Sequence, residues 1–193
     1  MLIVDILSQV HVEVSVAMKL KWPGINAKDT VVINLGLETF DLAEAPVLID
    51  NIYFTPKLEL HVTLLGEKVA SILKNKIRQD PETNVVLEHV FEDIDWSFKR
   101  SGPIHILSRR NKERTVQKTV ILLIDMPGMT SFYEQLKSLG LIADKSPVPP
   151  AHVTLYTHDC PLGIGVPSKE ILNSLIEKSF SVDEFNEILK QRR

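Results

Sequence analysis

The sequence lacks cysteine pairs, long apolar runs and an excess of basic charge. Cys160 is the only cysteine, so no disulfide can form within the chain, and a reducing compartment is the simpler expectation. No apolar run approaches the roughly 20 residues that cross a bilayer. Lys and Arg number 22 against 25 Asp and Glu, a formal net charge of -3. This balance argues against a generally basic nucleic-acid-binding protein.

The remaining composition is typical of one globular domain. The chain has 193 residues, of which 44% are hydrophobic and 24% charged. That is enough to bury a core without disulfide or metal support. The segment from Met1 to Asp5 has no basic region and carries an early acidic residue, so we expect no signal peptide. No low-complexity linker divides the sequence. We expect a single cytoplasmic domain over residues 1–193.

Strand-like patterns outnumber helical ones. Residues 10–21 and 58–65 alternate between apolar and other side chains, which is the period of a half-buried strand. Further strands are predicted by shorter apolar or β-branched runs, over 31–35, 47–54, 84–91, 94–98, 103–109, 117–125 and 151–157.

Helical periodicity marks four segments between these strands. An i, i+3, i+4 apolar stripe predicts a helix over 67–79. Ser131 and Glu134 fit a capping box, so a second helix is expected to begin there. Two more helices are expected to start near Ser168 and Asp183. Because the helices are scattered and the connections between strands are short, the predicted fold class is α+β with mainly antiparallel sheet.

One internal repeat stands out. His61-Val62-Thr63-Leu64, the first repeat, recurs 91 positions later as His152-Val153-Thr154-Leu155, the second repeat. By composition alone, His-x-Thr is expected roughly 0.3 times in such a chain, so a matched pair of quartets is informative. Coincidence, or a duplication that kept the fold without the chemistry, are the alternatives.

The spacing within each repeat has a chemical meaning. Residues i and i+2 of a strand point to the same side, so each His projects together with its Thr while the Val between them turns into the core. If the two strands lie side by side, two imidazoles and two hydroxyls converge. Two imidazoles can serve as general base and general acid near neutral pH. Hydroxyls can donate hydrogen bonds to phosphate oxygens, and no metal is required.

The paired motifs resemble those of the two-histidine phosphoesterase superfamily, the RNA ligase and cyclic phosphodiesterase-like enzymes. The resemblance covers roughly residues 50–180. It implies two pseudo-symmetric lobes of mainly antiparallel sheet with flanking helices around a central cleft, one His-x-Thr motif per lobe, at 61–63 and 152–154. It also implies a phosphodiesterase that acts without cofactor or metal. Its substrates would be RNA ends with a 2′,3′-cyclic phosphate, or cyclic or 2′-5′-linked oligonucleotides.

Carried over to this chain, the resemblance assigns roles to four residues. His61 and His152 would be the acid–base pair, with no indication of which is acid and which is base. Thr63 and Thr154 would hold the phosphate. No membrane and no obligate protein partner are expected.

Two further residues are candidates for substrate binding. Tyr156 lies four positions after His152, so in a regular strand it would share the face of the imidazole and could stack a base. Arg109 belongs to a short basic run up to Lys118 that could bind an oligonucleotide backbone, although a solvated hairpin loop is the simpler interpretation. Trp22 and Tyr53 could also stack a base, but we expect both to be packing residues.

Other classes of function are weighed against this one. The fold could bind a nucleotide or RNA without turning it over, as a sensor or sponge. A metal-dependent hydrolase is a third reading, for which His158-Asp159-Cys160 is the only hint, and its spacing matches no common zinc pattern.

Overall fold

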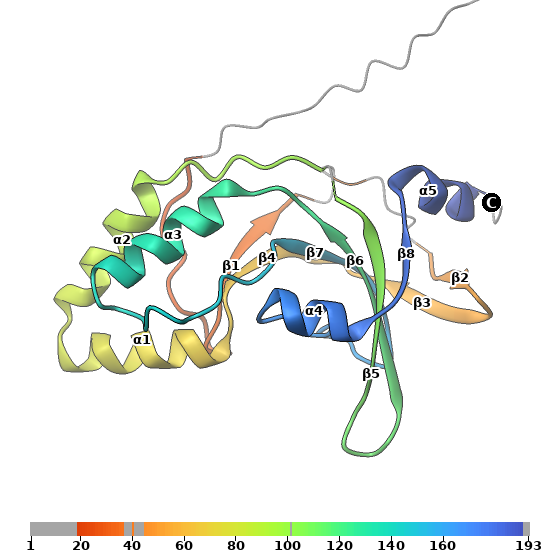
Figure 1. Ribbon diagram of the computed structural model, residues 1–193, viewed down its shortest axis with the longest axis horizontal. Coiled ribbons are helices and arrows are strands. Elements are labelled where there is room, and N and C mark those ends of the chain that lie inside the picture. The colour runs from red at the N-terminus through yellow and green to blue at the C-terminus, as the bar shows by residue number, and fades with distance from the viewer. Residues whose placement is uncertain (1–18, 37–39, 41–44, 101, 191–193) are drawn as a thin grey trace, which may run out of the picture.

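A computed structural model describes residues 19–36, 40, 45–100 and 102–190. Within them the chain forms an α+β fold, as predicted (Figure 1). The strands in this part of the chain are β1 (Val31–Leu35), β2 (Val47–Ile49), β3 (Ile52–Pro56), β4 (Leu60–Leu65), β5 (Ile104–Arg110), β6 (Val116–Leu123), β7 (His152–His158) and β8 (Ile176–Phe180). The helices of the described residues are α1 (Glu67–Gln79), α2 (Glu82–Asp93), α3 (Pro127–Ser138), α4 (Lys169–Leu175) and α5 (Val182–Lys190).

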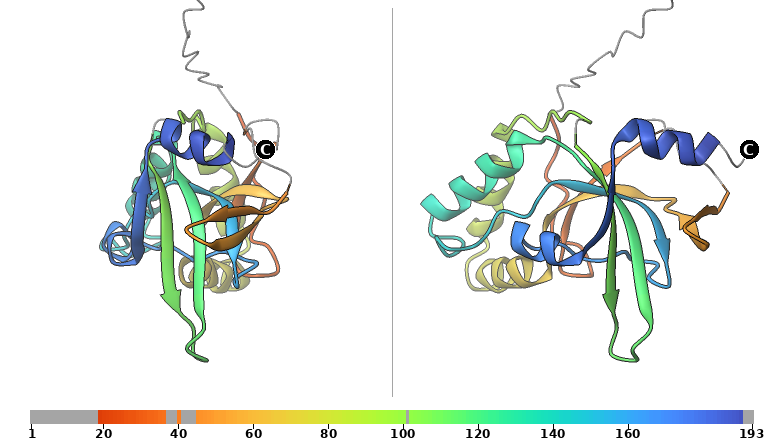
Figure 2. Two further views of the ribbon diagram at one scale, coloured as in Figure 1. Left: turned by 90° about the vertical axis from the view of Figure 1, so that its right-hand side faces the viewer. Right: turned by 45° about the vertical axis from the view of Figure 1, so that its right-hand side comes forward.

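The strands form one antiparallel sheet in the order β1-β4-β7-β6-β5-β8. β3 also pairs with β7, and β2 pairs with β3 as a hairpin. The hairpin of β5 and β6 extends beyond the rest of the sheet (Figure 2). The two strands that carry the repeats, β4 and β7, are therefore neighbours in one continuous sheet.

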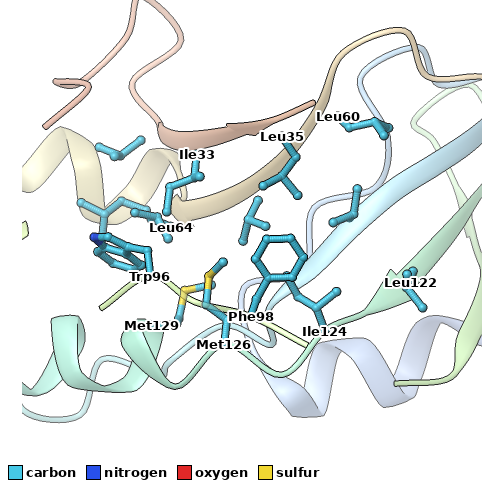
Figure 3. Packing of buried hydrophobic residues seen from close by; sticks show 14 of the residues in the cluster. Ile33, Leu35, Leu60, Leu64, Trp96, Phe98, Leu122, Ile124, Met126 and Met129 are labelled. Carbon is cyan, nitrogen blue, oxygen red and sulfur yellow. The ribbon is translucent and has the colours of Figure 1, made fainter. Parts of the chain in front are cut away.

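The main core lies between one face of the sheet and the helices α1, α2 and α3. Trp96, Met126 and Met129 pack there against Ile33 of β1 and Leu64 of β4 (Figure 3). α5 extends the same core with Phe185, which contacts Tyr156 and Phe180.

A second, smaller core covers part of the opposite face. It consists of Leu107, Ile121, Cys160, Ile164, Val166 and Leu172, from β5, β6, the loop after β7 and α4. In β6, Val120 and Leu122 belong to the main core and Ile121 to the second, as the alternation of a strand requires. The sheet thus has apolar side chains on both faces, and the space beside the second core is where the repeats present their polar side chains.

Several predicted elements are confirmed. The helix over 67–79 is α1, and helices begin after Ser168 and beside Asp183 as expected. Ser168 caps α4, because its Oγ accepts a hydrogen bond from the backbone N–H of Ile171 at 3.3 Å. The strand expected over 47–54 is divided into β2 and β3 by a turn at Asp50 and Asn51, which both have positive φ.

Other predictions are wrong. The segment 84–91 lies within α2, whose buried residues Thr83, Leu87 and Phe91 follow a helical spacing. The segment 94–98 forms no strand. α3 begins at Pro127, and Ser131 lies inside it, so there is no capping box at that position.

The strand expected over 10–21 falls mostly outside the described residues, and its last three positions, 19–21, are not in a strand. In the described part of the chain, none of the helices combines the length and apolar character needed to cross a bilayer.

Candidate active site

The two repeats lie next to each other on β4 and β7. Val62 of the first repeat pairs with Val153 of the second, and both valines are fully buried in the main core. Because neighbouring residues of a strand point to opposite faces, the flanking His and Thr side chains all emerge on the face away from that core. Those side chains are half-buried, and they belong to His61, Thr63, His152 and Thr154.

The antiparallel direction of the two strands sets how these side chains are paired. One position either side of the valine pair, His61 comes beside Thr154, and Thr63 comes beside His152. Each imidazole therefore has a hydroxyl from the other repeat as its cross-strand neighbour, and the imidazoles lie on a diagonal.

Each repeat contains a β-bulge at the same position. In the pairing of β1 with β4, Val31 faces Leu65 and Val32 faces Thr63, so Leu64 is the extra residue. In the pairing of β6 with β7, the partners skip Leu155 in the same way. The fourth residue of both quartets is thus the bulged one, and bulges of this kind re-aim the neighbouring side chains.

The carbonyl oxygens of both bulged residues accept hydrogen bonds from segments other than the strand across the bulge. The hydroxyl of Tyr133, in α3, donates to the carbonyl of Leu64 at 3.0 Å. The backbone N–H of Lys57, just after β3, donates to the carbonyl of Leu155 at 2.8 Å. Two unrelated segments therefore fix the same irregularity in the two repeats.

The imidazoles are oriented by the backbone two residues upstream. Nδ1 of His152 is 2.8 Å from the carbonyl oxygen of Pro150, and His61 forms a backbone hydrogen bond with Glu59. A carbonyl only accepts, so Nδ1 of His152 carries a proton. Its Nε2 is then the atom that can accept a proton when the ring is neutral.

Both imidazoles favour the neutral form in the free protein. Burial and the charge of Lys57 lower the pKa of His61, and the backbone hydrogen bond and the charge of Glu59 oppose them only in part. Burial also lowers the pKa of His152, and a positive charge on His61 lowers it further. A bound anion would oppose both effects, because it favours the protonated ring.

The surroundings of the two imidazoles differ. The strand neighbour of His61 in β1 is Asn34, which is exposed, whereas the neighbour of His152 in β6 is Leu123, which packs against the second core. Gly163, in the loop after β7, lies so close to Thr154 that a Cβ on it would be 3.2 Å from the hydroxyl oxygen. The site is therefore bordered by the second core beside His152 and by the exposed Asn34 of β1 beside His61.

Tyr156 does not share the face of His152, and that expectation is wrong. The bulge at Leu155 shifts the alternation of β7 by one residue. Tyr156 is consequently 0% exposed and packs against Phe185 in the main core. Leu65, the matching residue of the first repeat, is buried there for the same reason.

Arg109 lies far from the imidazoles along the sheet. It pairs with Gln117, six positions along β6 from Leu123, the partner of His152. At the rise of a strand this separation is roughly 20 Å. Nε of Arg109 donates to Oε1 of Gln117 at 3.0 Å, in the exposed part of the β5–β6 hairpin (Figure 2). Arg109 is therefore not part of the arrangement around the repeats.

The remaining residues considered for base stacking or metal binding are Trp22, Tyr53 and His158. Trp22 packs against Phe91, as expected of a core aromatic, but Tyr53 is 68% exposed and is not a packing residue. Nδ1 of His158 is bonded to the carbonyl of Tyr53. Among the described residues, no group of three or more His, Cys, Asp or Glu could hold a metal ion.

Two neighbours of the site were not predicted. Lys57 influences His61 electrostatically and is tied to the second repeat by its backbone, and Gly163 contacts Thr154. The only sequence signal for Lys57 is its position four residues before His61, which is no motif. Comparison with protein-family models, with curated proteins and with solved structures found no match to this chain.

Proposed function

We propose that this protein is a phosphodiesterase that uses two histidines for general acid–base catalysis without a metal ion. The substrate class is an RNA end with a 2′,3′-cyclic phosphate, or a cyclic or 2′-5′-linked oligonucleotide. In this proposal the pair of repeats has the role it has in the two-histidine phosphoesterase superfamily, with two pseudo-symmetric lobes around a central cleft.

The proposed reaction is an in-line displacement at phosphorus. One imidazole, neutral, accepts a proton from water or an internal 2′-hydroxyl as the nucleophile's oxygen forms a bond to phosphorus. The bond from phosphorus to the leaving oxygen breaks, and the other imidazole, protonated, gives that oxygen its proton. The two rings have then exchanged protonation states, and exchange with water restores them.

The hydroxyls of Thr63 and Thr154 donate hydrogen bonds to the non-bridging phosphate oxygens. Because each hydroxyl lies beside the imidazole of the other repeat, a phosphate between the strands has a donor and an acid–base group on either side.

One observation carries this proposal. Both His-x-Thr pairs emerge on the same face of adjacent strands, and a bulge occupies the same position of each repeat. Packing alone does not require matched polar side chains or matched bulges, which are features associated with active sites.

A cleavage assay in the presence of chelator tests the proposal. The substrates are 2′,3′-cyclic mononucleotides, 2′-5′ oligoadenylate and 3′,5′-linked cyclic di- and trinucleotides. We expect turnover of at least one class, and a loss of at least about 100-fold in rate for His61→Ala and for His152→Ala. His89→Ala is the matched control, because His89 is an exposed histidine of α2.

Full activity in either repeat variant would remove the role assigned to its imidazole. Activity that disappears with chelator would favour a metal-dependent hydrolase. Binding of a nucleotide without any product would favour a sensor or sponge on the same fold.

A further inference from the structure

The most exposed large apolar side chains of the described residues are near the proposed active site. Leu58 is 77% exposed and Leu162 is 71% exposed. Leu58 lies in the connection between β3 and β4, and Leu162 lies in the loop after β7. A single exposed leucine is ordinary, so the significance of this pair depends on what lies between them.

Lys57 joins the two loops that carry these leucines. Its Nζ donates to the carbonyl oxygen of Pro161 at 3.0 Å. Leu58 directly follows Lys57 and Leu162 directly follows Pro161, so one leucine flanks each end of this hydrogen bond. Because the backbone N–H of Lys57 is bonded to Leu155, the lysine is fixed at both its backbone and its ammonium group.

The hydrogen bond between Lys57 and Pro161 lies next to one end of the proposed active site. Leu155 directly follows Thr154, and the loop that contains Pro161 also brings Gly163 against Thr154. The charge of Lys57 is near enough to His61 to affect its titration. Lys57 therefore borders the end of the site formed by His61 and Thr154, and Leu58 and Leu162 are the residues next to Lys57 and to its hydrogen-bond partner Pro161.

The chemistry of this border is that of a nucleotide subsite. An ammonium group has three N–H donors, and the bond to Pro161 uses one. Within the described part of the chain, no carboxylate forms an ion pair with Lys57. Glu59 also acts electrostatically on His61, but it forms no ion pair with Lys57 in the described part of the chain, so a phosphodiester can pair with this cation. The faces of a nucleobase suit apolar side chains.

We infer that Lys57, Leu58 and Leu162 form the nucleoside subsite of the enzyme. Lys57 donates to a non-bridging oxygen of the substrate phosphate, and the two leucines contact the nucleobase attached on the side of His61. This inference rests on the proposed function, because it takes the phosphate to lie at the two repeats.

Binding measurements separate the contribution of the cation from that of the leucines. The probes are 2′,3′-cyclic AMP and dimethyl phosphate, a diester without a base, titrated by NMR into protein carrying His152→Ala to prevent turnover. We expect Lys57→Met to weaken both probes by at least about 10-fold, since one charged hydrogen bond is lost. The double variant Leu58→Ser, Leu162→Ser is expected to weaken cyclic AMP at least about 5-fold and to leave dimethyl phosphate unchanged.

Two matched variants control for general surface effects. Leu139→Ser removes a leucine that is 50% exposed after α3, and Lys112→Met removes an exposed lysine of the β5–β6 hairpin. Neither is expected to change binding of either probe.

The outcomes distinguish this inference from the proposed function. Unchanged cyclic AMP binding in the leucine variant, or an equal loss for both probes, overturns the subsite even if the wild-type protein is an active phosphodiesterase. If the leucine variant selectively loses cyclic AMP binding but the wild-type protein turns over no substrate, the subsite is supported and the proposed phosphodiesterase activity is wrong. If the leucine variant changes only the self-association of the protein, measured by sedimentation, the two leucines form an interface between copies and the inference is wrong.

Discussion

Val62 of β4 lies directly opposite Val153 of β7, and both side chains are fully buried. This pair determines the position of every polar side chain of the two repeats. A shift of either strand by one residue would turn its own imidazole and threonine into the main core and its own valine out of it. The burial of the valines is thus what holds the proposed catalytic groups on the accessible face.

Tyr133→Phe tests whether the first bulge depends on α3. The buried hydroxyl donates to the carbonyl of Leu64, and burial raises its pKa, so it stays a donor over the whole physiological range. Its removal leaves a buried carbonyl without this partner, and we expect a loss of about 1–3 kcal/mol in the free energy of unfolding, measured with urea. Tyr53→Phe, at an exposed tyrosine, is expected to change it little. Equal stability of the two variants would contradict the role given to Tyr133.

Gly163→Ala tests the contact between the loop after β7 and Thr154. Gly163 has a φ of +83°, where an alanine costs about 1–2 kcal/mol, and the added Cβ would press on the threonine hydroxyl. Gly24→Ala is a matched control, because Gly24 has a φ of +74° and no atom within 4 Å of the added Cβ. We expect similar losses of stability in both variants but a lower kcat/KM only for Gly163→Ala. Normal activity in Gly163→Ala would show that this contact does not position Thr154.

The stability of the protein is expected to fall between pH 7 and pH 5. The pKa values of His61, His105 and His152 are all lowered from 6.5 in the folded state, chiefly by burial. Below pH 6.5 the unfolded chain therefore binds more protons than the folded one. The free energy of unfolding thus rises with pH up to about 6.5 and then levels off.

Urea unfolding at a series of pH values measures this slope. The carboxyl groups with lowered pKa, among them Glu184, titrate around and below the unfolded value of 4.5, so the histidines dominate the slope in the upper part of the window, above about pH 5.5. The combined variant His61→Asn, His152→Asn is expected to have a shallower slope than the wild type. A flat wild-type curve over this window would contradict the burial assigned to these rings.

The strands that carry the repeats were predictable, but the irregularities within them were not. The alternation of apolar and polar residues located β4, a shorter apolar and β-branched run located β7, and the identical quartets indicated that the two strands belong together. A pattern of period two assumes a regular strand, so it placed Tyr156 beside His152. The bulge that turns Tyr156 into the core depends on pairing with β6, which is more than 30 positions away.

Long-range contacts also account for the other differences. The run Val85, Val86, Leu87 suggested a strand because β-branched residues favour one, yet burial of Leu87 and Phe91 against the other helices selects α2. Lys57 resembles any other surface lysine in the sequence. Its position next to the site results from contacts with Leu155 and Pro161, the latter 104 residues away.

The pH dependence of catalysis follows from the same lowered pKa values. The reaction requires one protonated and one neutral imidazole, and kcat/KM reports the free enzyme. Because the pKa values of both His61 and His152 are below 6.5, the singly protonated pair is most populated below pH 6.5. We expect a bell-shaped profile of kcat/KM with its maximum on the acidic side of pH 6.5.

The profile of kcat is expected to reach its maximum at a higher pH than that of kcat/KM, because the bound phosphate anion favours protonation of both rings. Initial rates over pH 4.5–8.5, at substrate concentrations well below and well above KM, measure the two profiles. Lys57→Met is expected to move the alkaline limb of kcat/KM upwards, since it removes a positive charge near His61. A kcat/KM maximum above pH 7 would contradict a mechanism in which the reactive form has one of these two imidazoles protonated and the other neutral.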